Sequence, residues 1–193
     1  SLEGGGKVPS IQQLYGAMVV NEPRNDQIVE DVVRCFQSGG NALVLTERTA
    51  HVAVLAEKVR GQIPDVIALT GSKGAKETRE ALAKVAESPT DRPLTLIATG
   101  RYIGEGFDEP RLDTLFLAMP ISWKGTLQQY AGRLHRFYEG KREVRIYDYI
   151  DVHVPMLEKM YQKRLTGYAA IGYKARTEIA TGGSRDIIFD NTT

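Results

Sequence analysis

The chain has 193 residues, and its 25 lysine and arginine residues against 24 aspartate and glutamate residues give a formal net charge of +1. This length favours one compact domain with room for a small additional element, and 42% hydrophobic residues exclude a largely disordered chain. No apolar stretch approaches the ~20 residues that cross a bilayer, so we expect no membrane partner. The only cysteine, Cys35, excludes an internal disulfide and fits a reducing, cytoplasmic compartment.

Residues 1–24 are expected to form a leader and linker outside the main domain. The pair Gly6-Lys7 does not complete a phosphate-binding loop, because Val8 follows the lysine and Ser1 stands where the first glycine belongs. This segment therefore provides no phosphate loop.

From Asn25 onward, apolar patterns with helical spacing alternate with short continuous apolar runs. The first helix is expected to start at Asn25 or Asp26 and to end before Gly39-Gly40. Cys35 continues its apolar spacing, so we interpret this residue as a partly buried thiol and not as a nucleophile. Further helices are expected at 50–60, 75–86 and 125–138, and strands at 42–45, 66–69, 94–98, 114–118 and 143–150.

This alternation predicts an α/β fold with a parallel sheet covered by helices on both faces. After it, a last helix is expected from Pro155 to about Leu165, continuing towards Tyr173, and residues 181–193 are expected to be loose. The expected division is thus 1–24, a main domain at 25–152, and a helical extension with a loose tail at 153–193.

Glycines gather just past the predicted strands, at the edge where an open parallel sheet binds ligands. For any single glycine the alternative is plain turn chemistry. Polar residues at the same predicted edge favour a rim that binds phosphates or nucleic acid. The glycines are Gly71, Gly100, Gly104, Gly106 and Gly125, and the polar residues are Thr46, Arg48, Thr70, Thr99, Arg101 and Asp108.

Three competing kinds of site find little support. A dinucleotide fingerprint fails because Glu109 stands where its third glycine belongs. A metal site is not indicated, because His51, His135 and His153 are scattered along the chain and Cys35 has no nearby partner. Nor does a nucleophile-elbow motif surround any serine.

The densest functional pattern lies on the helix expected at 125–138. Arg133 and Arg136 are three residues apart and therefore project from one face, with Gln129 one turn earlier, while Gly132 permits close approach of another backbone. Two planar guanidinium groups and an amide suit a polyphosphate. The alternative is a solvated basic helix that pairs with Glu139 or Glu143.

The segment Gln129-x-x-Gly132-Arg133-x-x-Arg136 resembles motif VI of superfamily 2 helicases. Residues 98–110 resemble their motif V, residues 43–48 their motif IV, and Leu69-Thr70-Gly71 the conserved glycine segment between them. The four matches stand in the order of the second RecA-like motor domain and, in the predicted fold, meet at one sheet edge. Within this superfamily the chain most resembles the DEAD/DEAH-type helicases akin to restriction-enzyme motor subunits and archaeal-type DNA-repair helicases. Leu134-His135 and Tyr130 depart from the pattern of the DEAD-box RNA helicases, which favours DNA.

The resemblance implies a three-layer RecA-like domain and assigns roles to single residues. Arg133 and Arg136 would be arginine fingers that stabilise the transferring γ-phosphoryl group, and Gln129 would sense the γ-phosphate. The nucleotide would also be contacted by Gly106, Asp108 and Gly132. Backbone phosphates of the nucleic acid would be held by Thr46, Arg48, Gly71, Thr99 and Arg101. Trp123 is expected to be a packed structural residue, with base stacking as the alternative.

In such motors ATP and Mg are held mainly by an N-terminal RecA-like domain, which would be the partner of this one. Because the chain has no phosphate loop and no Mg-binding Asp-Glu pair after a strand, it should not hydrolyse ATP alone. The sequence thus predicts the second motor domain of an ATP-dependent DNA helicase or translocase. The alternatives are a degenerate RecA-like module that binds DNA or protein without ATPase activity, and the motor part of a restriction or conflict system.

Overall fold

The computed structural model describes residues 6–70, 74–103, 107–135, 143–151, 153–180 and 183–190. Across these ranges the chain forms a seven-stranded sheet in the order β2-β3-β1-β4-β5-β7-β6. The strands β1 to β5 are parallel, and β7 and β6 continue the sheet in antiparallel pairing. The strand bounds are β1 Ala42–Thr46, β2 Ile67–Leu69, β3 Thr95–Thr99, β4 Thr114–Leu117, β5 Val144–Tyr149, β6 Lys174–Ala180 and β7 Gly183–Asp190.

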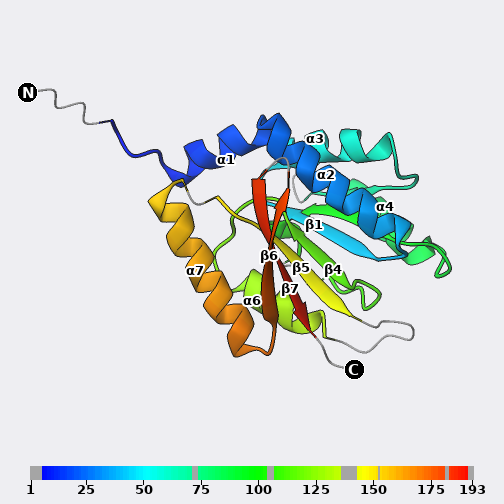
Figure 1. The fold of residues 1–193 in the computed structure, drawn as a ribbon. Coiled ribbons are helices and arrows are strands. Elements are labelled where there is room, and N and C mark those ends of the chain that lie inside the picture. Colours follow the sequence, from blue (N-terminus) through cyan, green and yellow to red (C-terminus); the bar gives the residue numbers. More distant parts are fainter. Residues whose placement is uncertain are drawn as a thin grey trace, which may run out of the picture.

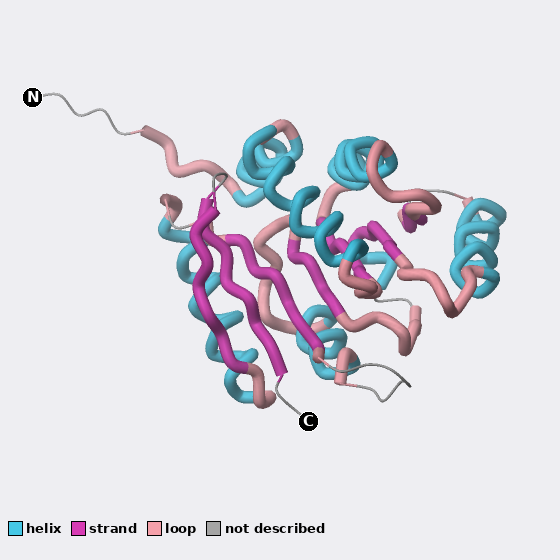
Figure 2. Tube along the Cα trace, turned by 45° about the vertical axis from the view of Figure 1, so that its right-hand side comes forward, coloured by secondary structure: helices cyan, strands magenta, loops and turns pink. Residues whose placement is uncertain are grey.

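Helices cover both faces of this sheet (Figure 2). On one face α2 and α3 pack against β1 and the centre of the sheet, in a core that includes Ile28, Val32 and Phe116. On the other face α4, α6 and α7 pack around Leu96, Leu115 and Ile146. The helix bounds are α1 Ile11–Val19, α2 Glu22–Gln37, α3 Thr49–Arg60, α4 Ala75–Glu87, α5 Gly100–Ile103, α6 Thr126–Arg133 and α7 Pro155–Ala170. The predicted three-layer α/β architecture is confirmed.

The N-terminal segment is not a simple linker, because it contains α1. Ser10 begins this helix with a capping box: its hydroxyl accepts from the backbone N–H of Gln13, whose side chain accepts in return from the N–H of Ser10. Tyr15 and Met18 of α1 are buried against Met119 and Leu157. The helix therefore belongs to the domain, and the expectation for 1–24 is wrong over Ile11–Val19.

The next helix also starts earlier than expected. Asn21, and not Asn25 or Asp26, caps α2, with its side-chain oxygen 3.2 Å from the backbone nitrogen of Arg24. Pro23 lies in the first turn, where its missing N–H costs nothing.

The C-terminal segment differs most from the sequence-based expectation. The helix α7 ends at Ala170, and a hairpin of β6 and β7 follows, with β7 paired to β5 from Val144↔Asp190 to Tyr149↔Arg185. Figure 1 shows this hairpin, in orange to red, beside β5. Residues 183–190 are therefore part of the sheet and not a loose tail, and the sheet does not end at the boundary expected near residue 152.

Candidate functional site

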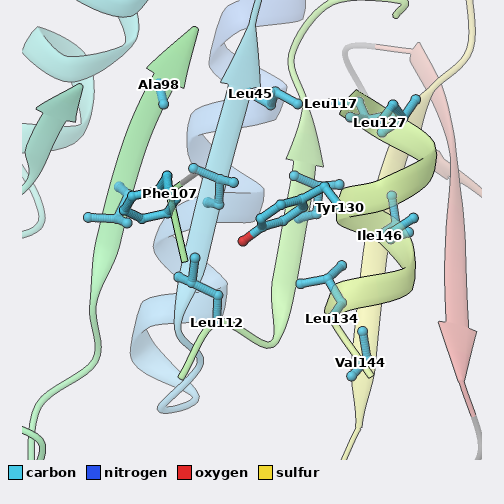
Figure 3. Packing of buried hydrophobic residues seen from close by; sticks show 14 of the residues in the cluster. Leu45, Ala98, Phe107, Leu112, Leu117, Leu127, Tyr130, Leu134, Val144 and Ile146 are labelled. Carbon is cyan, nitrogen blue, oxygen red and sulfur yellow. The ribbon is translucent and has the colours of Figure 1, made fainter. Parts of the chain in front are cut away.

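The helix α6 and the segment 107–109 form one side of the candidate site. Arg133 is exposed on α6, and its Nη1 lies 3.5 Å from the backbone oxygen of Phe107. Tyr130, one turn earlier, is buried between α6 and the sheet, in the same apolar cluster as Phe107 (Figure 3). Burial raises the pKa of Tyr130 well above its usual value, the charges of Asp108 and Glu109 raise it further, and the charge of Arg133 opposes them. The structure thus brings the motif V and motif VI matches together.

A buried ion pair holds this segment in place. Arg111 is 6% exposed and pairs with Glu109 at 2.9 Å. The same guanidinium donates to the carbonyls of Val85 at 3.0 Å and Ser88 at 3.2 Å, at the end of α4. Glu109 is therefore a structural residue, whereas the neighbouring Asp108 faces solvent.

Gln129 and Gly132 are exposed on α6 together with Arg133. Gln129 precedes Arg133 by four residues, so the two share a helix face. A side chain built on Gly132 would meet nothing within 4 Å, which leaves this surface open to another chain or a ligand. Arg136 and Gly106, both predicted for the same site, lie outside the described residues.

The second group of predicted residues lies where β1 and β3 end. Thr46 and Thr99 are register partners at the last positions of these strands, and α5 starts directly after β3 with Gly100 and Arg101. A Cβ on Gly100 would come within 2.6 Å of the Glu47 carboxylate, so the absence of a side chain there lets this carboxylate lie against the start of α5.

This edge carries a cleft of about 330 Å³ whose lining includes Glu47, Gly100, Arg101 and Lys124. Arg101 is exposed. Arg48 contacts α1, where its Nη2 donates to the backbone oxygen of Gln12 at 3.1 Å. Gly71, also predicted for this group, lies outside the described ranges.

The structure moves Thr46 from the predicted rim into the interior. Its side chain is fully buried, and its hydroxyl lies 2.8 Å from Nδ1 of His51. Nε2 of His51 lies 2.8 Å from Oδ1 of Asn25, whose amide nitrogen donates to the backbone oxygen of Val19. Because Oδ1 only accepts, Nε2 carries the proton and Nδ1 accepts from Thr46. The Thr46 side chain therefore has a structural contact and does not face a ligand.

The two groups do not share one sheet edge, which corrects the expected arrangement. The start of α6 at Leu127 lies beside Leu45 and Leu117, near the carboxyl ends of the strands, whereas Leu134 lies beside Val144, the first residue of β5 (Figure 3). An eight-residue helix rises ~12 Å, about the length of a four-residue strand, so α6 extends from the carboxyl ends of the strands to their amino ends. Arg133 thus lies towards the amino ends of the strands, away from Thr99 and Arg101.

Trp123 and Cys35, which we interpret from the sequence as structural residues, both pack against other parts of the domain. The Trp123 ring contacts Tyr168 edge-on, with 5.0 Å between ring centroids, and fits against Gly167 of α7, so the packing interpretation is confirmed. Cys35 is 9% exposed, as its place in the apolar spacing of α2 predicts, and burial raises the pKa of its thiol to about 11. Tyr130 and Leu134 are also buried, so these two departures from the RNA-helicase pattern lie in the core.

Two kinds of feature are absent from the part of the chain that the structure describes. No helix there has the length and apolar character needed to cross a membrane. No group of three or more histidine, cysteine, aspartate or glutamate side chains in the same ranges is placed to hold a metal ion.

Comparisons with known proteins place the fold. No family model matches the chain. It is similar to the transcript termination protein A18 of fowlpox virus, with 24% identity over 71% of this chain and 29% of that protein. The corresponding protein OPG145 of vaccinia virus is 26% identical over 61% of this chain and 24% of its own length. The chain thus spans less than a third of these relatives.

Solved structures share the architecture. T4 UvsW matches with a TM-score of 0.65 at 18% identity, covering 86% of this chain and 36% of that one. The C-terminal part of the Fun30 ATPase domain matches at 0.57 and 16% identity, covering 72% and 44%. The C-terminal domain of the DEAD-box protein Dbp5 matches at 0.57 and 20% identity, covering 74% and 78%. The RecA-like fold expected from the motifs is therefore confirmed.

Proposed function

We propose that this chain is the second RecA-like motor domain of an ATP-dependent helicase or translocase that acts on DNA. The observation that carries the proposal is the position of Arg133, exposed on α6 and in contact with the segment that presents Asp108. The fold likeness to ATPase and DEAD-box C-terminal domains supports it. A binding module without ATPase activity has no need of an exposed arginine at this place.

In this proposal ATP lies between this domain and an N-terminal RecA-like domain that holds the phosphates and Mg. The bound nucleotide supplies the γ-phosphoryl group that is transferred to water. The guanidinium of Arg133 donates to that group and stabilises the negative charge that develops in the transition state. Arg136 is proposed for the same role, Gln129 contacts the γ-phosphate, and Asp108 accepts from the ribose hydroxyls.

The nucleic acid would lie at the carboxyl ends of the strands. There Arg48 and Arg101 pair with backbone phosphates of the nucleic acid, beside Thr99 at the end of β3. Such contacts position the strand without reading its sequence. Nucleotide and nucleic acid would thus occupy separate surfaces, and closing the cleft between the two domains would move this domain along the strand.

The preference for DNA rests on the sequence pattern at Leu134-His135, and relation to the DNA-repair or restriction branch is part of the same hypothesis. The viral relatives are named for transcript termination and not for DNA repair or restriction.

The test is ATP turnover by this chain and by the full-length protein, each with single-stranded DNA or RNA of equal length. We expect the isolated chain to be inactive and the full-length protein to be stimulated more by DNA. ATP turnover by the isolated chain would overturn the proposal that a separate N-terminal domain holds the nucleotide. Stronger stimulation by RNA would replace DNA as the substrate, and no turnover with either strand would favour the binding module.

A further inference from the structure

The last turn of α6 needs a hydrogen-bond partner from elsewhere in the chain. The final carbonyl groups of a helix have no i+4 partner within it. At the end of α6, the N–H of Leu134 donates to the carbonyl of Tyr130 at 3.1 Å, and the N–H of His135 donates to that of Gly132 at 3.4 Å. The carbonyl of Ala131 accepts from the hydroxyl of Tyr173 at 2.9 Å.

Both partners of this bond are shielded from water. Ala131 is fully buried and Tyr173 is 4% exposed, so solvent cannot easily replace the hydroxyl as donor. The ring of Tyr173 also lies 4.6 Å from that of His135, just beyond α6. Tyr173 therefore holds the turn that carries Arg133 through both a hydrogen bond and a ring contact.

The end of α7 fixes Tyr173 in turn. Gly172 has φ +95°, a conformation that glycine adopts without strain. Its N–H donates to the carbonyl of Ala169 at 3.1 Å, and the N–H of Tyr173 donates to that of Tyr168 at 3.0 Å. This pair of bonds is a Schellman motif, in which the residue after the glycine folds back on the helix. Accordingly, the rings of Tyr168 and Tyr173 meet with centroids 6.4 Å apart.

A buried ion pair anchors this arrangement to the sheet. The hydroxyl of Tyr168 donates to Asp148 of β5 at 2.9 Å. Arg164 of α7 holds the same carboxylate with two bonds of 2.8 and 2.9 Å, and both charged side chains are 1% exposed. A continuous set of contacts thus runs from β5 through Tyr168 and Tyr173 to the last turn of α6.

We propose that Tyr173 is a positioning residue for Arg133, supplied by a segment that lies outside the region of motif resemblance. The inference rests on the proposed function, in which Arg133 reaches the nucleotide. By closing the last turn of α6, Tyr173 limits the directions in which the guanidinium can point, and transition-state stabilisation depends on such preorganisation.

The experiment compares Tyr173→Phe with wild type in the full-length protein, measuring kcat and KM for ATP hydrolysis. The variant keeps the ring and loses only the hydroxyl, so we expect kcat to fall about tenfold while KM changes by less than about twofold. The control is Tyr149→Phe. Its hydroxyl is also buried, and it donates at 2.9 Å to Asp31 in the core under α2 and α3. We expect this control to lower the melting temperature and to leave kcat unchanged.

Two further measurements separate failure of this inference from failure of the proposed function. If Arg133→Ala abolishes turnover and Tyr173→Phe does not change it, the positioning role is overturned and the function stands. If Arg133→Ala also leaves turnover unchanged, the proposed function fails. Hydrogen exchange then tests the contact itself: faster exchange of the α6 amides in Tyr173→Phe than in Tyr149→Phe supports it, and equal exchange contradicts it.

Discussion

At the scale of single residues, a buried network fills the place where the sequence predicts a ligand contact. His51 is fully buried and links Thr46 at the end of β1 to Asn25 of α2. Burial, together with the nearby charge of Arg24, lowers the pKa of His51 to about 4. In the folded protein this imidazole is therefore neutral at pH 7 and remains so in mild acid.

This depressed pKa predicts a specific loss of stability in acid. As the pH falls below about 6.5, the unfolded chain takes up a proton at His51 that the folded chain refuses until about pH 4. Over that window His51 should lower the free energy of unfolding by up to ~1.4 kcal/mol per pH unit. When the free energy of unfolding is measured with urea at pH 7, 6 and 5, it should fall less steeply with decreasing pH for His51→Gln than for wild type. His153→Gln, which changes an exposed histidine, should keep the wild-type slope, and identical slopes for all three proteins would refute the assignment.

At the scale of elements, the packing of α7 depends on one missing side chain. Gly167 lies in the last turn of this helix, where a Cβ would overlap the indole ring of Trp123. Trp123 belongs to the segment between β4 and α6, so this contact fixes the approach of α7 to the start of the candidate site helix. A rigid aromatic ring cannot move aside as the end of a lysine could.

We therefore expect Gly167→Ala to destabilise the protein by roughly 1–3 kcal/mol, the usual effect of overpacking. The matched control is Gly16→Ala in α1, a helical glycine whose added Cβ meets nothing within 4 Å. That change should be neutral or should stabilise by up to ~1 kcal/mol, because alanine favours the helix. Chemical denaturation measures both, and equal effects of the two substitutions would exclude the close fit of α7 against Trp123.

At the scale of the whole molecule, the C-terminal segment is built into the domain by buried polar contacts. Arg185 of β7 pairs with Asp31 of α2 at 2.8 Å, and both are nearly inaccessible. The hydroxyl of Tyr161 on α7 donates to Asp186 of β7. Removing one partner of a buried charged pair leaves the other uncompensated. The hairpin and α7 therefore stabilise the same folded unit as the motif-bearing strands.

The sequence predicts some parts of this fold well because their signals are local. The runs at 42–46 and 114–117 are continuous and apolar, as strands covered on both faces must be. The strand β6 has no such signal, because it is an exposed edge strand with Lys174 and Arg176 along it, and β7 offers only the short apolar run at 187–189. The place of this hairpin in the sheet depends on long-range pairing such as Asp148↔Asp186. The capping box at Ser10 is a local signal for α1.

The candidate site shows the same division. The exposed face of α6 with Gln129 and Arg133 follows from helical spacing alone. The burial of Thr46 does not, because the side chain at the end of a strand points in or out according to the packing of α2 and α3. The distance of Arg133 from the carboxyl edge likewise depends on how α6 runs along the sheet. Tyr173 is brought to α6 only by the fold-back after α7.

The central claim is that Arg133 acts on ATP bound by a partner domain, and its most direct test is kcat for ATP hydrolysis by the full-length Arg133→Ala protein. An arginine finger contributes about a thousandfold or more, so we predict a loss of that size with little change in nucleotide affinity. The control is Arg34→Ala, which removes an exposed arginine of α2 paired with Glu30 and should retain wild-type turnover. A kcat for Arg133→Ala within about twofold of wild type would contradict the account.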